Sequence, residues 1–317
     1  MGFLFIGRAG PSINLLSNPI PVTDSTQTAA PMQNWKLTLA YDGTEFRGWQ
    51  VQPGERTIQG ELQASLARVT GESPLPQGSG RTDAGVHALG QVASFALQAP
   101  IPPANLQRAL NRTLPEAIRV LDARTVPDAF HARHSAVTKT YEYRVFVERP
   151  APWLDGADAG ASCPPFLARY VYAFPWPLEM TALQKSAAQF VGQHDFLSFA
   201  ATDPDLATRG GVRGEHANHE QEPATAIRTI FSSAWEPRHT ENGQLLVYRV
   251  QGNGFLHHMV RNLVGTMLDA GRGYLGPEAI PAMLAARSRS ATGPTAPARG
   301  LFLHSVEYGS TNCGFRR

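Results

Sequence analysis

The chain has 317 residues, of which 42% are hydrophobic, which is enough for one large domain or two of ordinary size with a sizeable core. Its two cysteines, Cys163 and Cys313, argue against a disulfide framework and a structural zinc site, and no apolar run reaches the roughly 18 residues that a membrane span needs. We therefore expect a cytoplasmic protein without a membrane segment, and its formal net charge of +2 does not by itself require a nucleic-acid partner.

Arginine dominates the cationic residues. Lysine occurs only at Lys36, Lys139 and Lys185, so arginine supplies 25 of the 28. The planar guanidinium matches phosphate and carboxylate groups, but a genome rich in arginine codons produces the same bias. The bias alone does not choose between a nucleic-acid partner and a neutral explanation.

The chain begins with a segment that differs from the rest. Residues 1–33 mix Pro, Ser, Thr and Asn without periodicity, and we expect a disordered leader there. Ordered structure is expected from Trp35, because WKLTLAY alternates apolar and polar residues as a half-buried strand does. The turn signal Asp42-Gly43 ends this strand.

Helical and strand patterns then alternate along the first half. A helix is expected over 57–71, because its apolar residues recur on one helical face. These residues are Ile58, Leu62, Leu66 and Val69. The next expected elements are a strand over 90–97, a helix over 103–115, and strands over 117–126 and 139–147.

The second half repeats this rhythm. The expected elements are helices over 180–192, 256–271 and 278–287 and strands over 226–235, 244–253 and 301–308. Strands separated sometimes by a helix and sometimes by a short loop predict an α+β fold of two split βαβ units side by side. We place the halves at 34–137 and 138–312, followed by a tail over 313–317. The polar segment 203–225 is expected to be a long loop.

A glycine-rich stretch raises the first question of chemistry. Residues 78–95, GSGRTDAGVHALGQVASF, place Arg81 and Asp83 among three glycines before turning apolar. A dinucleotide fingerprint fails because Asp83 stands at the third glycine position, where its charge would repel a pyrophosphate, and because a strand follows instead of a helix. A P-loop fails because no Gly-Lys-Ser/Thr is present. We expect no nucleotide cofactor here.

Two interpretations of Asp83 remain open. In one, the glycines form a tight turn whose amides donate to Asp83. In the other, Asp83 lies beside Arg81 and acts as a charged nucleophile or stabiliser at an electron-poor carbon such as C1′ of a sugar. Glycoside hydrolases use a second carboxylate. Asp42 is the nearest formal candidate, although Asp-Gly after a strand is typical of a turn.

Five segments, taken together, carry a family resemblance. They are YDGTEFRGWQVQ at 41–52, GRTDAGVHALGQV at 80–92, FHARHSAVTKTYEYRVF at 130–146, GNGFLHHMVRNLVGTM at 252–267 and ARGLFLHSVEY at 298–308. In this order they resemble the TruA-type tRNA pseudouridine synthases, and the segment at 80–92 is similar to that family's signature. The resemblance covers the chain from residue 35 to residue 308.

The resemblance implies a cofactor-free isomerase that converts uridine to pseudouridine at positions 38, 39 and 40 in the anticodon stem-loop of tRNA. It implies two ferredoxin-like halves, with antiparallel sheets joined side by side, helices on one face and an active-site cleft between the halves. The expected partners are tRNA and a second copy of the chain in a homodimer. Neither a cofactor nor a metal is implied.

The resemblance also assigns residues. Asp83 falls on the family's catalytic aspartate, and Arg261 falls on the arginine that pairs with it. Tyr141 falls on the active-site tyrosine, Arg81 on an arginine implicated in flipping the base, and Leu301 on an apolar residue that lines the pocket. The candidates for RNA contacts are Arg47, Lys139, Arg144 and His87.

Two histidine pairs, His257-His258 and His131-x-x-His134, raise the question of a metal site. No carboxylate or cysteine at metal spacing completes either pair, so we expect none. By pattern alone, Tyr141 in an alternating strand is typical of a packed tyrosine, and Arg261 of a surface arginine.

Two rival functions remain. A catalytically silent RNA-binding module on the same fold would have no need for Asp83, Tyr141 and Arg261 together. A nucleotide-dependent oxidoreductase would need a helix after Gly80, where GQVASFAL indicates a strand instead.

Overall fold

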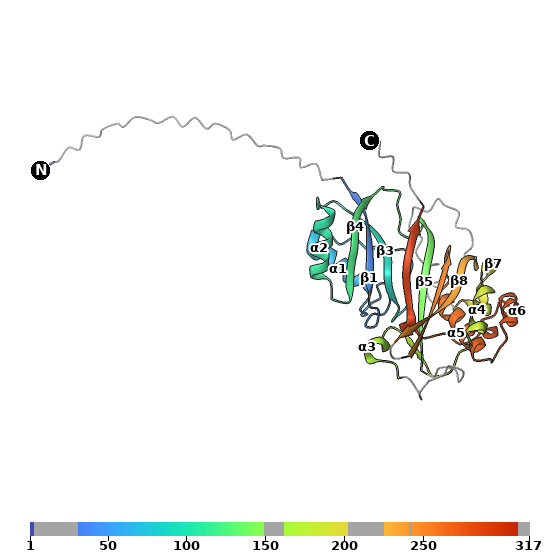
Figure 1. The fold of residues 1–317 in the computed structure, drawn as a ribbon. Helices are drawn as coiled ribbons and strands as arrows, with labels where there is room; N and C mark the ends of the chain where they lie inside the picture. Colours follow the sequence, from blue (N-terminus) through green and yellow to red (C-terminus); the bar gives the residue numbers. More distant parts are fainter. Residues whose placement is uncertain (3–30, 149–161, 202–224, 241–242, 310–317) are drawn as a thin grey trace, which may run out of the picture.

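The computed structural model describes residues 1–2, 31–148, 162–201, 225–240 and 243–309 (Figure 1). Most of the expected leader, nearly all of the loop expected over 203–225 and the whole tail lie outside the described residues. The described residues form a mixed structure of helices and one large sheet, so the expected α+β class is confirmed. The finer description as two ferredoxin-like halves stays a prediction.

Ten strands make up the sheet. They are β1 (Gln33–Tyr41), β2 (Gln77–Gly78), β3 (His87–Leu97), β4 (Ile118–Val126), β5 (Ala136–Val147), β6 (Tyr172–Phe174), β7 (Gly192–Asp195), β8 (Ile227–Thr240), β9 (Gly243–Gly252) and β10 (Leu301–Tyr308). The main order is β4-β1-β3-β10-β5-β9-β8-β7, while β2 pairs with β3 and β6 with β5. Neighbouring strands run antiparallel except β10 with β3 and β5 with β6.

The described helices lie between these strands. They are α1 (Ile58–Thr70), α2 (Pro103–Thr113), α3 (Pro165–Ala168), α4 (Met180–Ala188), α5 (Met259–Gly271) and α6 (Ile280–Ala285), with short 3-10 turns η1 (Leu197–Phe199), η3 (Pro277–Ala279), η4 (Arg289–Ala291) and η5 (Ala298–Gly300). None of the helices in the described segments is long and apolar enough to cross a membrane.

Local signals explain how α1 begins and ends. The Thr57 side chain accepts a hydrogen bond from the Gly60 amide and caps the first turn, and Gly71 ends the helix in the left-handed conformation, with φ 78°. The apolar face expected from the sequence is present, because Ile58, Leu62 and Leu66 are fully buried.

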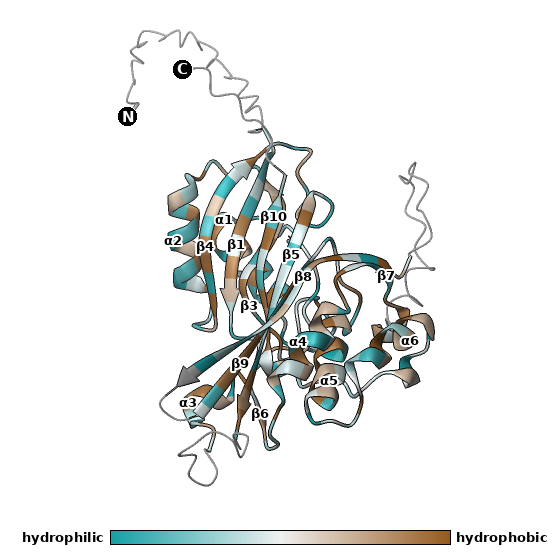
Figure 2. Cartoon of the chain, turned by 45° about the vertical axis from the view of Figure 1, so that its right-hand side comes forward, coloured by the Kyte–Doolittle hydropathy of each residue, from teal (hydrophilic) through white to brown (hydrophobic). Residues whose placement is uncertain are grey.

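The helices α1, α2, α4 and α5 pack on one face of the sheet, which we call the helix face. On β1 the residues Trp35, Leu37, Leu39 and Tyr41 are buried in a core cluster that also contains the apolar residues of α1 and α2. Trp235 of β8 donates to the sulfur of Met267 in α5. Trp235 pairs with Tyr248 of β9, which in turn pairs with Tyr143 of β5. Because paired residues point to the same face, α5 covers that same side. Figure 2 shows the resulting mixture of apolar and polar residues along the strands.

The last strand joins the two parts of the sheet. β10 lies between β3 and β5, and its parallel pairing with β3 comprises only Phe302 with His87 and Leu303 with Ala88. Because this ladder is short, side-chain contacts also hold β3 and β10 together. On the face opposite the helices, the Phe302 ring stacks on His87 at 4.7 Å between ring centroids, and the Arg144 guanidinium lies 4.0 Å from the Phe302 ring.

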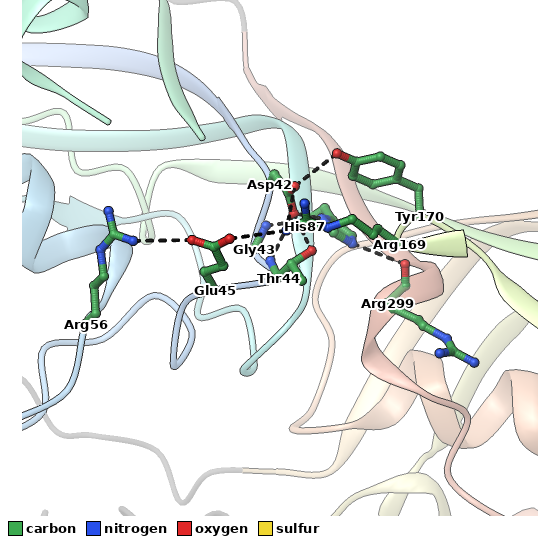
Figure 3. A network of polar contacts seen from close by, with 9 residues as sticks. All are labelled: Asp42, Gly43, Thr44, Glu45, Arg56, His87, Arg169, Tyr170 and Arg299. Carbon is green, nitrogen blue, oxygen red and sulfur yellow. Dashed lines mark hydrogen bonds and ion pairs between the residues drawn. The ribbon is translucent and has the colours of Figure 1, made fainter. Parts of the chain in front are cut away.

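A polar network continues this joint (Figure 3). Tyr170 donates to Asp42 at 3.0 Å, and Arg169 lies 3.4 Å from Glu45, which is also 3.6 Å from Arg56. Asp42 accepts from the amide and hydroxyl of Thr44 as well. Asp42 is therefore a turn residue that also contacts Tyr170. These contacts give no support to the role of a second catalytic carboxylate for Asp42.

His87 belongs to the same network. Its side chain is 1% exposed, its Nδ1 accepts from the Gly43 amide at 3.1 Å, and its Nε2 lies 3.1 Å from the Arg299 carbonyl oxygen. Burial lowers the pKa of His87 more than the nearby Asp42 carboxylate raises it, so the ring is neutral at pH 7. This burial gives no support to the expectation that His87 contacts RNA.

Candidate active site

The glycine-rich loop between β2 and β3 carries Asp83, and backbone contacts fix its position. The Trp49 amide donates to the Thr82 carbonyl at 3.0 Å, and the Val86 amide closes a turn on the Asp83 carbonyl at 3.1 Å. Gly48 has φ 89°, and a Cβ there would come within 2.5 Å of the Thr82 carbonyl oxygen. The loop therefore rests directly on the backbone that follows β1.

Buried polar side chains hold the loop from beneath. Tyr41 shares a 2.8 Å hydrogen bond with the Thr82 hydroxyl, and burial raises the pKa of Tyr41 to about 12. Gln91 donates to the Gly80 carbonyl at 3.0 Å and accepts from the Ser79 hydroxyl at 2.6 Å. Because buried polar groups are costly unless they are paired, this network favours one loop conformation.

Three groups from the second half surround the Asp83 carboxylate, which is 21% exposed. Arg261 Nη1 donates to Asp83 Oδ2 at 3.0 Å, and His258 Nε2 lies 3.2 Å from the same oxygen. His257 Nε2 lies 3.4 Å from Oδ1. A hydrogen bond between charged groups, such as the one from Arg261, is roughly twice as strong as a neutral one, so it orients the carboxylate.

The start of α5 delivers these groups. The helix expected from residue 256 begins at Met259 instead, because His258 adopts the left-handed conformation with φ 58°. This conformation is uncommon for a residue other than glycine, and such residues cluster at functional sites. Arg261 Nε donates to the Ala296 carbonyl at 2.8 Å, which leaves Nη1 directed at Asp83.

The two histidines face Asp83 through Nε2. His257 Nδ1 is buried and has no hydrogen-bond partner among the described residues, so an N–H there would be costly and the ring proton belongs on Nε2. Burial, with the charges of His257, Arg261 and Arg289, lowers the pKa of His258 more than Asp83 raises it. Both rings lie with Nε2 close to the carboxylate, at 3.4 Å for His257 and 3.2 Å for His258.

Tyr141 and Leu301 lie on the helix face near this cluster. The Tyr141 ring is 8% exposed and meets Phe255 edge to face, with 4.9 Å between ring centroids. Burial, helped by the charges of Tyr41 and Asp83, raises the pKa of Tyr141 well above its ordinary value, so its hydroxyl stays protonated. Leu301 is 5% exposed, pairs with Tyr143, and begins the strand in which Leu303 pairs with Tyr141.

The same cluster corrects one inference from the sequence. Asp83 supplies the carboxylate that the His257-His258 pair was expected to lack, and the three donor atoms lie within 4.8 Å of one another. No local pattern indicates this contact, because Asp83 and the two histidines are far apart in the chain. The Arg261 guanidinium already contacts Asp83 Oδ2, so a metal ion would have to compete with it for that oxygen.

The cationic candidates lie in different surroundings. Arg81 is exposed, and Arg47 is exposed with its Nε 3.2 Å from Glu55. Arg144 pairs at 2.7 Å with the buried Glu142 on the face opposite Tyr141. Lys139 Nζ donates to the Ser79 carbonyl at 2.6 Å, beside the Asp83 loop. A pocket of about 470 Å³ lined by Asn34, Gln77 and Phe130 contains none of the expected site residues.

Sequence reasoning missed that His257 and His258 contact Asp83. In the sequence, this pair of histidines raises only the question of a metal site. The available signal was their spacing from Arg261. His257 and His258 lie four and three residues before it in a segment whose pattern predicts a helix, and residues at that spacing lie on one helical face.

Comparison with known proteins adds a second line of evidence. The sequence model of a family described as tRNA pseudouridine synthase matches residues 38–135 and 186–309. A protein named tRNA pseudouridine synthase A from Solibacter usitatus is 47% identical over 278 residues, covering 87% of this chain and all of its own. Proteins of the same name from Moorella thermoacetica and Maridesulfovibrio salexigens are 43% and 40% identical, covering 86% and 89% of this chain and 98% and 93% of their own.

Proposed function

The chain belongs to the tRNA pseudouridine synthase family, and we propose that it converts uridine to pseudouridine at positions 38, 39 and 40 of the anticodon stem-loop, with Asp83 as the catalytic residue. The observation that carries the assignment of Asp83 is its carboxylate, which is partly exposed and surrounded by Arg261, His257 and His258. An RNA-binding module without activity would have no use for this arrangement.

The reaction needs a positioned anion. The bond from C1′ to N1 breaks, the uracil turns within the site and C5 bonds to C1′; the C5 proton then leaves and N1 takes up a proton, so the product is an isomer of the substrate. A carboxylate can add to C1′, or it can assist loss of the C2′ proton toward a glycal. In either route Arg261 and the two histidines hold Asp83 in place and stabilise its charge without moving during the reaction.

Tyr141 supplies the second part of the site. Its ring offers a surface on which the extruded uracil can stack, and Phe255 holds that ring from the side. Because burial keeps its hydroxyl protonated, Tyr141 can donate a hydrogen bond to the base and relay the C5 proton. Leu301 provides apolar contact beside it.

The target uridine has to leave its stacked position before it can reach Asp83. Extruding a nucleotide costs a few kcal/mol, which contacts to the displaced backbone can offset. Arg81, exposed two residues before Asp83, is suited to that contact. A homodimer, which the family resemblance implies, and the cytoplasmic location expected from the cysteine content complete the proposal.

Tritium release from tRNA labelled at C5 of uridine tests the proposal. The native enzyme should release tritium from substrates that carry uridine at position 38, 39 or 40 and not from a tRNA in which all three are replaced. Asp83→Asn should abolish release, because an amide is no nucleophile at C1′, while its melting temperature stays close to that of the native protein. Equal release from both proteins would remove Asp83 from the mechanism.

A further inference from the structure

A second group of cations lies beside the Asp83 loop, and we call Lys139, Arg133 and Arg228 the Lys139 cluster. Lys139 is on β5, Arg228 is on β8, and Arg133 is on the turn that precedes β5. The Lys139 ammonium donates to the Ser79 carbonyl, and a Cβ on Gly80 would lie 3.3 Å from Nζ. The absence of a side chain at Gly80 thus lets the ammonium approach the loop that carries Asp83.

The sheet places this cluster next to Tyr141. Lys139 pairs with Gly252 of β9, and Tyr141 pairs with Val250, so both side chains point to the helix face. The Cα atoms of residues two apart on a strand are about 6.7 Å apart, so Lys139 and Tyr141 are neighbours on this face. The Arg228 side chain approaches Gly254, just beyond β9, and its guanidinium donates to the Thr225 and Ile227 carbonyls.

Among the described residues, Arg133 and Arg228 are the charged groups that shift the pKa of Lys139. Burial, together with the positive charges of Arg133 and Arg228, lowers the pKa of Lys139 to about 8. From the neighbouring strands, Lys139 faces Gly252 and Val306, whereas Glu307 pairs with Thr138 and points to the other face. Burial also lowers the pKa of Arg228, as does Arg133. An anion that binds close to Lys139 and Arg228, both partly buried, interacts favourably with their positive charges.

We propose that the Lys139 cluster binds a backbone phosphate of the RNA strand beside the target nucleotide, an inference that rests on the proposed function. The cluster borders the Asp83 loop and lies two strand residues from Tyr141, where the chain flanking an extruded uridine has to pass. An ammonium and two guanidiniums suit a phosphate. The contact holds the strand in register and carries no base specificity.

The test measures tRNA binding by the full-length protein between pH 6.5 and 9.5. The protonated lysine is the form that binds phosphate, so native affinity should fall about 3- to 10-fold as pH rises through the Lys139 pKa. Lys139→Arg should bind with nearly constant affinity over this range, because a guanidinium remains charged. An unchanged pH dependence in Lys139→Arg would overturn the proposal.

Two further variants separate a phosphate contact from a structural role. Lys139→Gln should weaken binding at pH 7, reduce the slope of log affinity against log salt by about one, and raise KM more than it lowers kcat. The exposed Lys185 of α4 offers the control, and Lys185→Gln should leave affinity, slope and pH dependence unchanged. Native-like binding by Lys139→Gln would also overturn the inference.

Binding and tritium release report on different claims. If the native protein releases no tritium from tRNA, the proposed function fails, whatever the binding curves show. If it releases tritium and Lys139→Arg keeps the native pH dependence, only the phosphate site fails.

Discussion

Asp83 makes contacts that cross between the two parts of the chain. The acid comes from the loop before β3, while its partners His257, His258 and Arg261 come from the start of α5. A hydrogen bond to a charged group typically contributes about 1.5–3 kcal/mol, and here the one from Arg261 fixes the orientation of the carboxylate. The arrangement is therefore preorganised before any substrate arrives.

Two hydrogen bonds hold the Arg261 side chain in place. A substitution that keeps the positive charge but changes the shape of the side chain tests whether this position matters for catalysis. Arg261→Lys keeps a cation but cannot bind the Ala296 carbonyl and Asp83 together. We expect kcat for tritium release to fall about 10- to 100-fold, which corresponds to about 1.4–2.7 kcal/mol. KM for tRNA should change little.

The matched control is Arg124→Lys, at an exposed arginine that pairs with Asp122 at 2.7 Å. An exposed pair of this kind contributes little, so neither activity nor melting temperature should change. If Arg261→Lys keeps native kcat, or loses activity only because it unfolds, the positioning role of Arg261 is refuted.

At the level of elements, α5 is held unusually close to the chain that precedes β10. A Cβ on Gly265 would lie 1.7 Å from the Pro294 carbonyl oxygen, and one on Gly293 would lie 2.7 Å from the Thr266 Cα. The hydroxyl of Thr266 also accepts from the Gly293 amide at 3.0 Å. This close contact brings Ala296 within reach of Arg261 and so sets where α5 presents its cation.

Gly265→Ala should therefore move the helix. We expect a loss of about 1–3 kcal/mol in the free energy of unfolding, since the overlap is with backbone. We also expect a fall in kcat larger than the change in KM, because Arg261 lies one turn away. Urea denaturation and tritium release measure the two effects.

Gly309→Ala is the control for the same substitution, since the nearest atom to its Cβ would be at an ordinary 3.7 Å. It should match the native protein in both assays. Native stability in Gly265→Ala would contradict the close packing described for α5.

For the whole molecule, the decisive feature is the position of β10 between β3 and β5. One core cluster of buried side chains includes Trp35 of β1 and Leu263 of α5, so it extends across both parts of the sheet. The Phe302 stack on His87 and the network of Figure 3 strengthen the short ladder between β3 and β10. The elements before and after β10 in the strand order therefore share one core cluster.

A shared core predicts cooperative unfolding. Calorimetry of the native protein should show one thermal transition with equal calorimetric and van't Hoff enthalpies. Phe302→Ala removes the ring that bridges His87 and Arg144, and should cost about 3–5 kcal/mol. It should lower activity as well, because Asp83 and Arg261 come from opposite sides of the joint. Two separate transitions in the native protein would instead indicate independent halves.

Much of the local structure is predictable from the sequence. The alternation of Trp35, Leu37 and Leu39 predicts β1, and the spacing of Ile58, Leu62 and Leu66 predicts α1, because each pattern follows from the geometry of a single element. The sequence does not predict the shorter strands β2, β6 and β7, since strands of two to four residues carry no periodic pattern. The family motifs nominated Asp83, Arg261 and Tyr141.

The sequence by itself determined which segments form strands and helices and which loop carries the acid, since these depend on neighbours in the chain. Only the tertiary structure decided that His258 meets Asp83, that His87 is buried in a joint and that Lys139 lies against the Asp83 loop. Those contacts join residues far apart in the chain, and they exist because β10 inserts between β3 and β5 and brings α5 to the loop. Strand order is a property of the whole core, and no local pattern encodes it.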